Sequence, residues 1–258
     1  IDKIEPWDRA YAAEKLREAR YSYSDAEVKR YFTQRAVFKG LFGLVEKLFG
    51  IEIEEAQASV WHPDVKYFEV KRNGEKIAAF YADLYAREGK RSGAWMDGER
   101  TRRIEDGKLI TPIAYLVTNF AAPQAGREAT MTHDEVTTLF HEFGHLLHLM
   151  FSRVSIPSLS GTNVPQDFVE VPSQFMENWC SHPDILRSFA RHERTGQPIP
   201  EDMLRSLEES RGNTPAITLV SQLLYAKTDL AVHMEPERFA AGSLDDADSI
   251  VAGDLEDF

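Results

Sequence analysis

The sequence predicts a mainly α-helical protein with a small β-sheet, an α+β fold. Apolar side chains recur at the spacing of amphipathic helices before residue 50 and after residue 130. Between these regions, segments 65–70 and 77–85 are rich in β-branched and aromatic residues, which is typical of strands. A chain of 258 residues can bury one sizeable core. We therefore expect residues 1–258 to form a single domain.

The composition limits which binding partners and which cellular compartment are expected for the protein. The net charge of −12 at pH 7 argues against a surface for nucleic acid or for an anionic membrane. The chain has no apolar run of about 18 residues, so no membrane-spanning helix is expected. A single cysteine, Cys180, excludes an internal disulfide and is typical of a reducing compartment. We expect a cytoplasmic protein that binds neither nucleic acid nor membranes.

The first elements are expected to be helices. Residues 7–21 have an amphipathic pattern, and the sequence SDAE at 24–27 is typical of a second helix start. A further helix is expected over 36–49, where Gly50 supplies a C-terminal stop. We assign no chemistry to these helices.

The next elements are expected to be strands. The dipeptide NG at 73–74 joins the first two of them and predicts a tight hairpin. Residues 87–95 are polar and glycine-bearing, which indicates a loop. A further strand is expected over 110–120, where Pro112 suits an edge strand or the start of a strand. An edge strand here can pair with an extended peptide, and a plain structural strand is the alternative.

The longest amphipathic pattern covers residues 132–150. Its apolar side chains form one broad stripe, and Thr132 followed by Glu135 predicts a capping box at the start of the helix. Gly144 lies inside this helix, where glycine costs about 1 kcal/mol relative to alanine. A packing reason or the close approach of another segment is therefore expected at this glycine.

His141, Glu142 and His145 form an HExxH array within this helix. Four residues are about one helical turn, so both imidazoles project from one face and can hold one metal ion. Two neutral nitrogens suit Zn²⁺, which prefers a tetrahedral site with one position left to water. Glu142 lies one residue round the helix, where its carboxylate can reach that water. The array predicts metal-assisted hydrolysis, and a core helix with a chance pair of histidines is the structural alternative.

A zinc site of this kind needs a third protein ligand. The metzincin pattern is excluded, because the positions that would be glycine and histidine are His148 and Phe151. His148 lies about two turns from His141, so we interpret it as a histidine that supports the ligands or packs beside them. A glutamate from a following helix is the other solution. Glu170 and Glu177 are both candidates.

Helical spacing returns after a loop over residues 152–165. Residues 167–180 are expected to be helical, with Pro172 best tolerated in a first turn. Three segments close the chain: expected helices over 201–211 and 218–233, and an acidic, frayed tail over 245–258.

Five segments of the chain together match one known family: VWHPDVKYFEV at 60–70, FYADLYAREGKRSGAWM at 80–96, YLVTNF at 115–120, THDEVTTLFHEFGHLLH at 132–148 and DFVEVPSQFMENW at 167–179. With these segments the sequence resembles the M3 (thimet oligopeptidase) family of zinc metallopeptidases, in particular its oligopeptidase A and dipeptidyl carboxypeptidase types. The resemblance covers most of residues 7–233. The resemblance implies a mostly helical fold with a small sheet around a zincin-like catalytic core.

The resemblance also implies roles for residues at matching positions. It implies that His141, His145 and Glu170 hold one Zn²⁺ per chain and that Glu142 is the general base. The implied activity is the hydrolysis of peptide bonds in short, unstructured peptides inside a deep channel. These short peptides are the expected partners.

The strand residues Thr118, Asn119 and Phe120 resemble the substrate-pairing edge strand of the family. Asp167 and Glu177 are candidates to orient the histidine ligands, as partners of metal-bound histidines commonly do. The alternative for both carboxylates is a plain surface charge.

The sequence also departs from the family pattern. Family members are far longer, and their glycine- and tyrosine-rich segment of the GYAAGYYSY kind helps to stabilise the tetrahedral intermediate. No tyrosine follows Tyr225 in this chain. The chain therefore looks like the central catalytic piece of a longer enzyme or a shortened relative. The alternative function is a zinc- and peptide-binding fragment with little catalysis, whose partners include the remaining segments of a longer enzyme.

Overall fold

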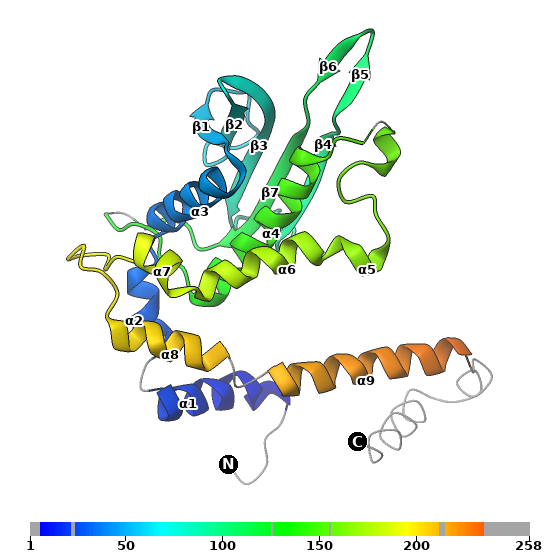
Figure 1. Ribbon diagram of the computed structural model, residues 1–258. Helices are drawn as coiled ribbons and strands as arrows, with labels where there is room; N and C mark the ends of the chain where they lie inside the picture. Colours follow the sequence, from blue (N-terminus) through cyan, green and yellow to red (C-terminus); the bar gives the residue numbers. More distant parts are fainter. Residues whose placement is uncertain (1–5, 22–23, 125, 155, 212–214, 235–258) are drawn as a thin grey trace. The chain divides into compact units, whose positions relative to one another are not determined.

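The computed structural model describes residues 6–21, 24–124, 126–154, 156–211 and 215–234 (Figure 1). The chain divides into two compact units, Ile1–Glu208 and Glu209–Phe258, and each is described by itself. The second unit contains helix α9 (Pro215–Met234), which confirms the helix expected over 218–233. The tail over 245–258 lies outside the described residues, and the single domain stays a prediction. Among the described helices, none is long and apolar enough to cross a membrane.

The N-terminal part of the chain is helical, as expected. Its elements are η1 (Pro6–Asp8), α1 (Arg9–Tyr21), α2 (Asp25–Val28), η2 (Lys29–Tyr31) and α3 (Gln34–Phe49). Ser24 and Thr33 cap α2 and α3 through their hydroxyl oxygens, which accept backbone N–H groups of the first turn. Helix α3 ends at Gly50, whose φ of +60° lies in the left-handed region that favours glycine.

A mixed five-stranded sheet follows. In spatial order its strands are β1 (Glu52–Ala56), β2 (Lys66–Arg72), β3 (Glu75–Tyr85), β7 (Ile113–Phe120) and β4 (Trp95–Arg100). Strands β3 and β7 are parallel, and the other neighbouring pairs are antiparallel. The turn between β2 and β3 has positive φ at Asn73 and Gly74, which confirms the predicted hairpin.

Several short strands are not predicted by the sequence pattern. They are β1, β4 and a separate hairpin of β5 (Arg103–Glu105) and β6 (Lys108–Ile110). Strand β1 reads EIEEA and β4 reads WMDGER, and most side chains of both are exposed. Strand prediction depends on a repeating apolar face, which these segments lack.

The strand expected over 110–120 is β7, and the alternative of an edge strand is wrong for Ile113–Val117, where β7 is paired on both sides. β7 pairs with β3 on one side and with β4 on the other. Pro112 lies just before β7, which agrees with the alternative of a strand start. The pairing of β4 with β7 ends at Val117. The free edge on this side of the sheet therefore belongs to β4.

Helices α3 and α4 (His133–Phe151) enclose the core against one face of the sheet (Figure 1). The Phe143 ring of α4 contacts Phe42 of α3 and Phe80 of β3, with centroids 5.9 and 5.7 Å apart. Phe80 and Phe143 are fully buried, so each contributes on the order of 2 kcal/mol through burial. This packing fixes the face of α4 that turns toward the core.

The segment after α4 forms a series of short helices. They are η3 (Pro157–Leu159), α5 (Gln166–Val169), α6 (Val171–Glu177), η4 (Asn178–Ser181), α7 (Pro183–Phe189) and α8 (Glu201–Arg211). The helix expected over 167–180 is interrupted at Glu170, which ends α5 and precedes α6. Pro172 lies in the first turn of α6, as expected. The helix over 201–211 is confirmed.

A buried ion-pair cluster around Asp83 fixes the loop between β3 and β4. The Asp83 carboxylate accepts hydrogen bonds from Arg87 at 2.6 and 2.7 Å and from Lys90 at 2.9 Å. Trp61 Nε1 donates to the same carboxylate, and Lys90 Nζ also donates to the Thr118 carbonyl. Burial raises the pKa of Asp83, but the hydrogen bonds from these donors outweigh it and hold the pKa well below its ordinary value.

We expect Asp83→Asn to lower the free energy of unfolding by about 3 kcal/mol at pH 7, because it leaves the buried Lys90 ammonium without a carboxylate partner. The folded-state pKa of Asp83 lies below its unfolded value. The stabilisation is therefore present above about pH 4 and is lost as the pH falls through the folded pKa. Urea unfolding at pH 7 and pH 3 should show a smaller difference between wild type and variant at pH 3. An equal difference at both pH values would contradict this account.

Candidate metal centre

Helix α4 carries the HExxH array and begins at a capping box. Thr132 Oγ1 accepts a hydrogen bond from the Glu135 N–H at 3.1 Å, and Glu135 Oε2 accepts one from the Thr132 N–H at 2.7 Å. This confirms the predicted helix start. The helix then runs from His133 to Phe151, so His141 and His145 lie one turn apart on the same face.

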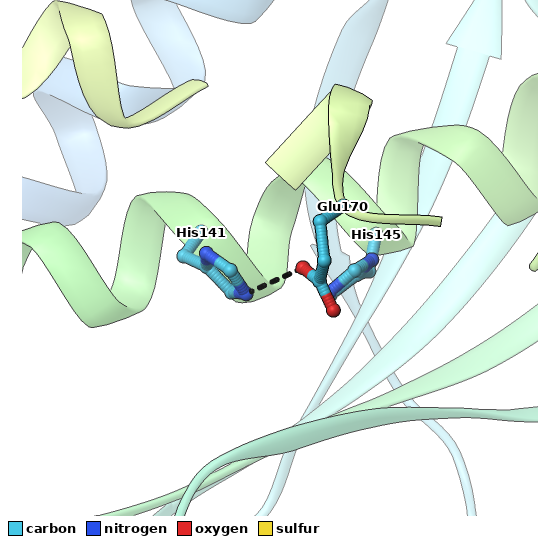
Figure 2. Close-up of side chains that lie close together, drawn as sticks. All are labelled: His141, His145 and Glu170. Atoms are coloured by element: carbon cyan, nitrogen blue, oxygen red, sulfur yellow. Dashed lines mark ion pairs between the residues drawn. The ribbon is translucent and has the colours of Figure 1, made fainter. Parts of the chain in front are cut away.

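The structure brings His141, His145 and Glu170 together (Figure 2). Glu170 Oε2 lies 3.2 Å from His141 Nε2 and 3.1 Å from His145 Nε2. The three ligand atoms lie within 4.8 Å of one another. Glu170 enters from the junction of α5 and α6, so two separate segments of the chain supply the cluster.

The donor set and its spacing fit a zinc ion. In a tetrahedral zinc site with bonds of about 2.0–2.1 Å, neighbouring ligand atoms are about 3.3 Å apart. The two distances from Glu170 Oε2 are 3.2 and 3.1 Å. Two imidazole nitrogens and one carboxylate oxygen form the ligand set of hydrolytic zinc sites that keep a fourth position for water. The cluster can therefore hold one such ion.

Gly144 allows the close approach of α4 and α6. A Cβ atom at this position would lie 2.6 Å from the Pro172 carbonyl oxygen and 2.6 Å from Ser173 Cα. The backbone of α6 thus occupies the space that any other side chain at position 144 would need. This contact confirms the expected close approach, and it brings Glu170 within reach of the two histidines.

We expect Gly144→Ala to lower zinc affinity by at least about tenfold and the free energy of unfolding by about 1–3 kcal/mol, because the new methyl group pushes α6 outward. Gly43→Ala is the matched control. Gly43 lies inside α3 and a Cβ there meets nothing within 4 Å, so alanine should stabilise the chain by about 0.4–1 kcal/mol. Zinc titration and urea unfolding of both variants measure the effects. Equal zinc affinity of Gly144→Ala and wild type would contradict the role of this contact.

His141 has a carboxylate partner on its second ring nitrogen. Glu177 Oε1 lies 2.6 Å from His141 Nδ1. When the ring proton sits on Nδ1 and is donated to this carboxylate, Nε2 keeps its lone pair of electrons. That lone pair is on the side of the ring that faces Glu170 and His145. Of the two candidates for the third ligand, Glu177 contacts the Nδ1 atom of His141, and Glu170 lies beside the Nε2 atoms of both histidines.

Burial acts on the other two groups of the array. Burial lowers the pKa of His145, which favours the neutral imidazole that a metal requires. Glu142 is 8% exposed, and burial raises the pKa of its carboxyl group, while nearby His141 lowers it and Glu170 raises it. A backbone hydrogen bond from Met96, in strand β4, also lowers the pKa of Glu142.

Two predicted supporting residues lie apart from the three ligand atoms. The His148 ring packs against Phe168, with centroids 6.2 Å apart, and burial lowers its pKa. His148 is not part of the cluster of ligand atoms that the described residues form. Asp167 is exposed in α5.

The side chains of the predicted substrate residues contact the sheet and the loop after β3. Thr118 Oγ1 donates to the Leu84 carbonyl, and Phe120 is buried. Asn119 Nδ2 donates to the carbonyl oxygens of loop residues Arg91 and Gly93 at 2.8 and 2.7 Å. These contacts give the three residues a structural role, and their pairing with a substrate stays a prediction.

Sequence reasoning does not find two groups that the structure brings to the site. Ser173 contacts Glu170 through its hydroxyl, and the Met96 backbone contacts Glu142. A serine three residues after a candidate ligand is a weak signal, because the spacing gains meaning only once a helix is known to begin at Val171. The backbone of Met96 carries no signal in the sequence.

Residues 1–253 match Peptidase family M3. The chain belongs to this family. It is 44% identical over 239 residues to oligopeptidase A of Escherichia coli (strain K12), covering 91% of this chain and 35% of that protein. It is 37% identical over 247 residues to the dipeptidyl carboxypeptidase of the same organism, covering 94% of this chain and 36% of the relative.

A plant relative extends the comparison. This M3 chain is 39% identical over 241 residues to the probable cytosolic oligopeptidase A of Arabidopsis thaliana, covering 90% of the chain and 34% of the relative. The chain thus spans about a third of the length of these curated relatives. Membership of the M3 family confirms the resemblance drawn from the sequence segments.

Proposed function

We propose that this chain is a zincin-like catalytic part of an M3 peptidase and that it hydrolyses peptide bonds in short peptides with one bound Zn²⁺. The observation that carries the proposal is the convergence of His141 Nε2, His145 Nε2 and Glu170 Oε2. Their chemistry and spacing fit zinc. Glu142 lies on the same helix, next to the first ligand, and completes the set of groups that hydrolysis needs.

Glu142 acts as the general base. When bound, zinc polarises the scissile carbonyl and lowers the pKa of a coordinated water toward about 7. The Glu142 carboxylate takes a proton from the attacking water and passes it to the leaving amine nitrogen.

The same geometry indicates where a peptide main chain lies. Strand β4 has a free edge, and its Met96 backbone contacts the proposed base. An extended peptide that pairs with β4 would therefore pass beside Glu142. This assigns main-chain pairing to the edge strand β4 in place of the part of β7 over Ile113–Val117, which pairs with strands on both sides.

Hydrolysis of an internally quenched short peptide by the full chain tests the proposal. The protein is freed of metal with a chelator, then assayed before and after addition of one equivalent of zinc. We expect turnover that appears with zinc and disappears again with excess chelator. Turnover that is unchanged by the chelator would contradict a metal-dependent reaction.

A zinc- and peptide-binding role without catalysis is the second candidate. The chain spans about a third of the length of its curated relatives. The loss of one group that stabilises the oxyanion typically costs about 10²- to 10³-fold in rate. Stoichiometric zinc binding without any turnover would favour this second candidate, in which further segments of a longer enzyme complete the site.

The cellular location stays a prediction. A cytoplasmic protein is expected from the single cysteine, Cys180. One relative is named a probable cytosolic oligopeptidase A, and another is named an organellar oligopeptidase A, chloroplastic or mitochondrial. We propose the cytoplasm, with short peptides as partners and no nucleic acid or membrane.

A further inference from the structure

Ser173 lies directly behind the proposed carboxylate ligand. Its Oγ is 2.6 Å from Glu170 Oε2 and 2.9 Å from the Glu170 carbonyl oxygen. Ser173 is fully buried at the third position of helix α6. The oxygen that it contacts is the same Oε2 that faces both histidine nitrogens.

The single hydroxyl proton of Ser173 is directed to the carboxylate. The Glu170 carbonyl oxygen already accepts the backbone N–H of Gln174 at 2.9 Å, so it is satisfied without the serine. The 2.6 Å contact has the length of a hydrogen bond from a hydroxyl to a charged oxygen. A carboxylate oxygen accepts more than one bond, so Oε2 keeps an electron pair for a metal.

The contact matters because the Glu170 side chain is only partly buried. Its side chain is 45% exposed, whereas the side chain of His145 is only 12% exposed. Ser173 lies in the close packing of α4 on α6, since a Cβ on Gly144 would be 2.6 Å from its Cα. The hydroxyl therefore links this packing to one oxygen of a partly exposed glutamate.

We propose that Ser173 is a positioning residue that holds Glu170 Oε2 in place for zinc and thereby sets the zinc affinity of the site. The inference rests on the proposed zinc function and adds to it a residue that does not itself bind the metal. Substitution of a residue that orients a metal ligand typically lowers metal affinity by about 10- to 100-fold.

Zinc titration against a chromophoric chelator tests this inference on the full chain. Ser173→Ala removes only the hydroxyl, and alanine is the best helix former, so α6 should be retained. We expect a zinc Kd about 10- to 100-fold higher than that of the wild type, with an unchanged far-UV circular dichroism spectrum. Ser160→Ala is the control, because that hydroxyl is equally buried and has no hydrogen-bond partner among the described residues. Its zinc Kd should not change.

A double-mutant cycle separates positioning from disturbed packing. In a Glu170→Ala background the serine has no ligand to hold, so adding Ser173→Ala should raise the zinc Kd no further. The inference is overturned if Ser173→Ala binds zinc as tightly as the wild type, or if it weakens binding equally in both backgrounds. Failure of the wild-type chain itself to bind zinc would overturn the proposed function together with this inference.

Discussion

We expect Glu142→Gln to lower kcat/KM for a short peptide by about 10²- to 10⁴-fold, while the zinc Kd stays within about twofold of the wild-type value. Glutamine has nearly the same shape but cannot accept the proton of the attacking water. The metal ligands belong to other residues, so metal binding should survive. Steady-state hydrolysis of a quenched peptide and zinc titration measure the two quantities on the same protein.

Two observations would speak against this role of Glu142. Wild-type turnover by Glu142→Gln would remove it from the reaction. A large loss of zinc affinity in the same variant would mean that the carboxylate at position 142 takes part in holding the metal, or that its buried position between α4 and β4 is disturbed.

Glu170→Ala should differ from Glu142→Gln in its effect on zinc affinity. We expect the zinc Kd to rise by more than about 100-fold, because one of three protein donors is lost, and turnover to fall with the bound metal. The Glu170 side chain is 45% exposed, so folding should be little affected. Competition with a chelator of known affinity measures the Kd, and circular dichroism checks the fold.

Asp167→Asn is the matched control for Glu170→Ala. Asp167 lies three residues earlier in the same short segment and is exposed. Its substitution removes the same charge from the same region without touching the cluster. An equal loss of zinc affinity in both variants would show that the net charge near the site matters more than the Glu170 ligand.

The local part of the site could be predicted from the sequence, because it depends on helix geometry alone. The spacing of His141 and His145 places both on one face of any α-helix, and Thr132 marks where that helix begins. The third ligand depends on packing between distant segments. The residues alone left Glu170 and Glu177 open, and the resemblance to a family selected Glu170.

The structure shows why both glutamates were plausible candidates. Glu170 faces the Nε2 atoms of both histidines, and Glu177 contacts the opposite nitrogen of His141. Both lie in the same segment, seven residues apart, and both approach α4. Only the break between α5 and α6 at Glu170, which the sequence pattern does not reveal, distinguishes their positions.

The sequence pattern predicts the apolar strands of the sheet but not the polar strands at its edges. β2 and β3 have buried faces and a turn dipeptide, so their period is visible in the sequence. β4 is mostly polar and exposed, and nothing in its pattern reveals that it covers the open side of β7. The alternative of an edge strand fails where β4 pairs with β7, over Ile113–Val117, and the sequence pattern does not reveal β4.

A crystal structure of the zinc-soaked chain, with anomalous data collected on both sides of the zinc absorption edge, tests the central claim most directly. We predict one anomalous peak per chain, bonded to His141 Nε2, His145 Nε2 and Glu170 Oε2 at about 2.0–2.2 Å. The absence of a peak between these three atoms, or a peak held by other residues, would contradict the account.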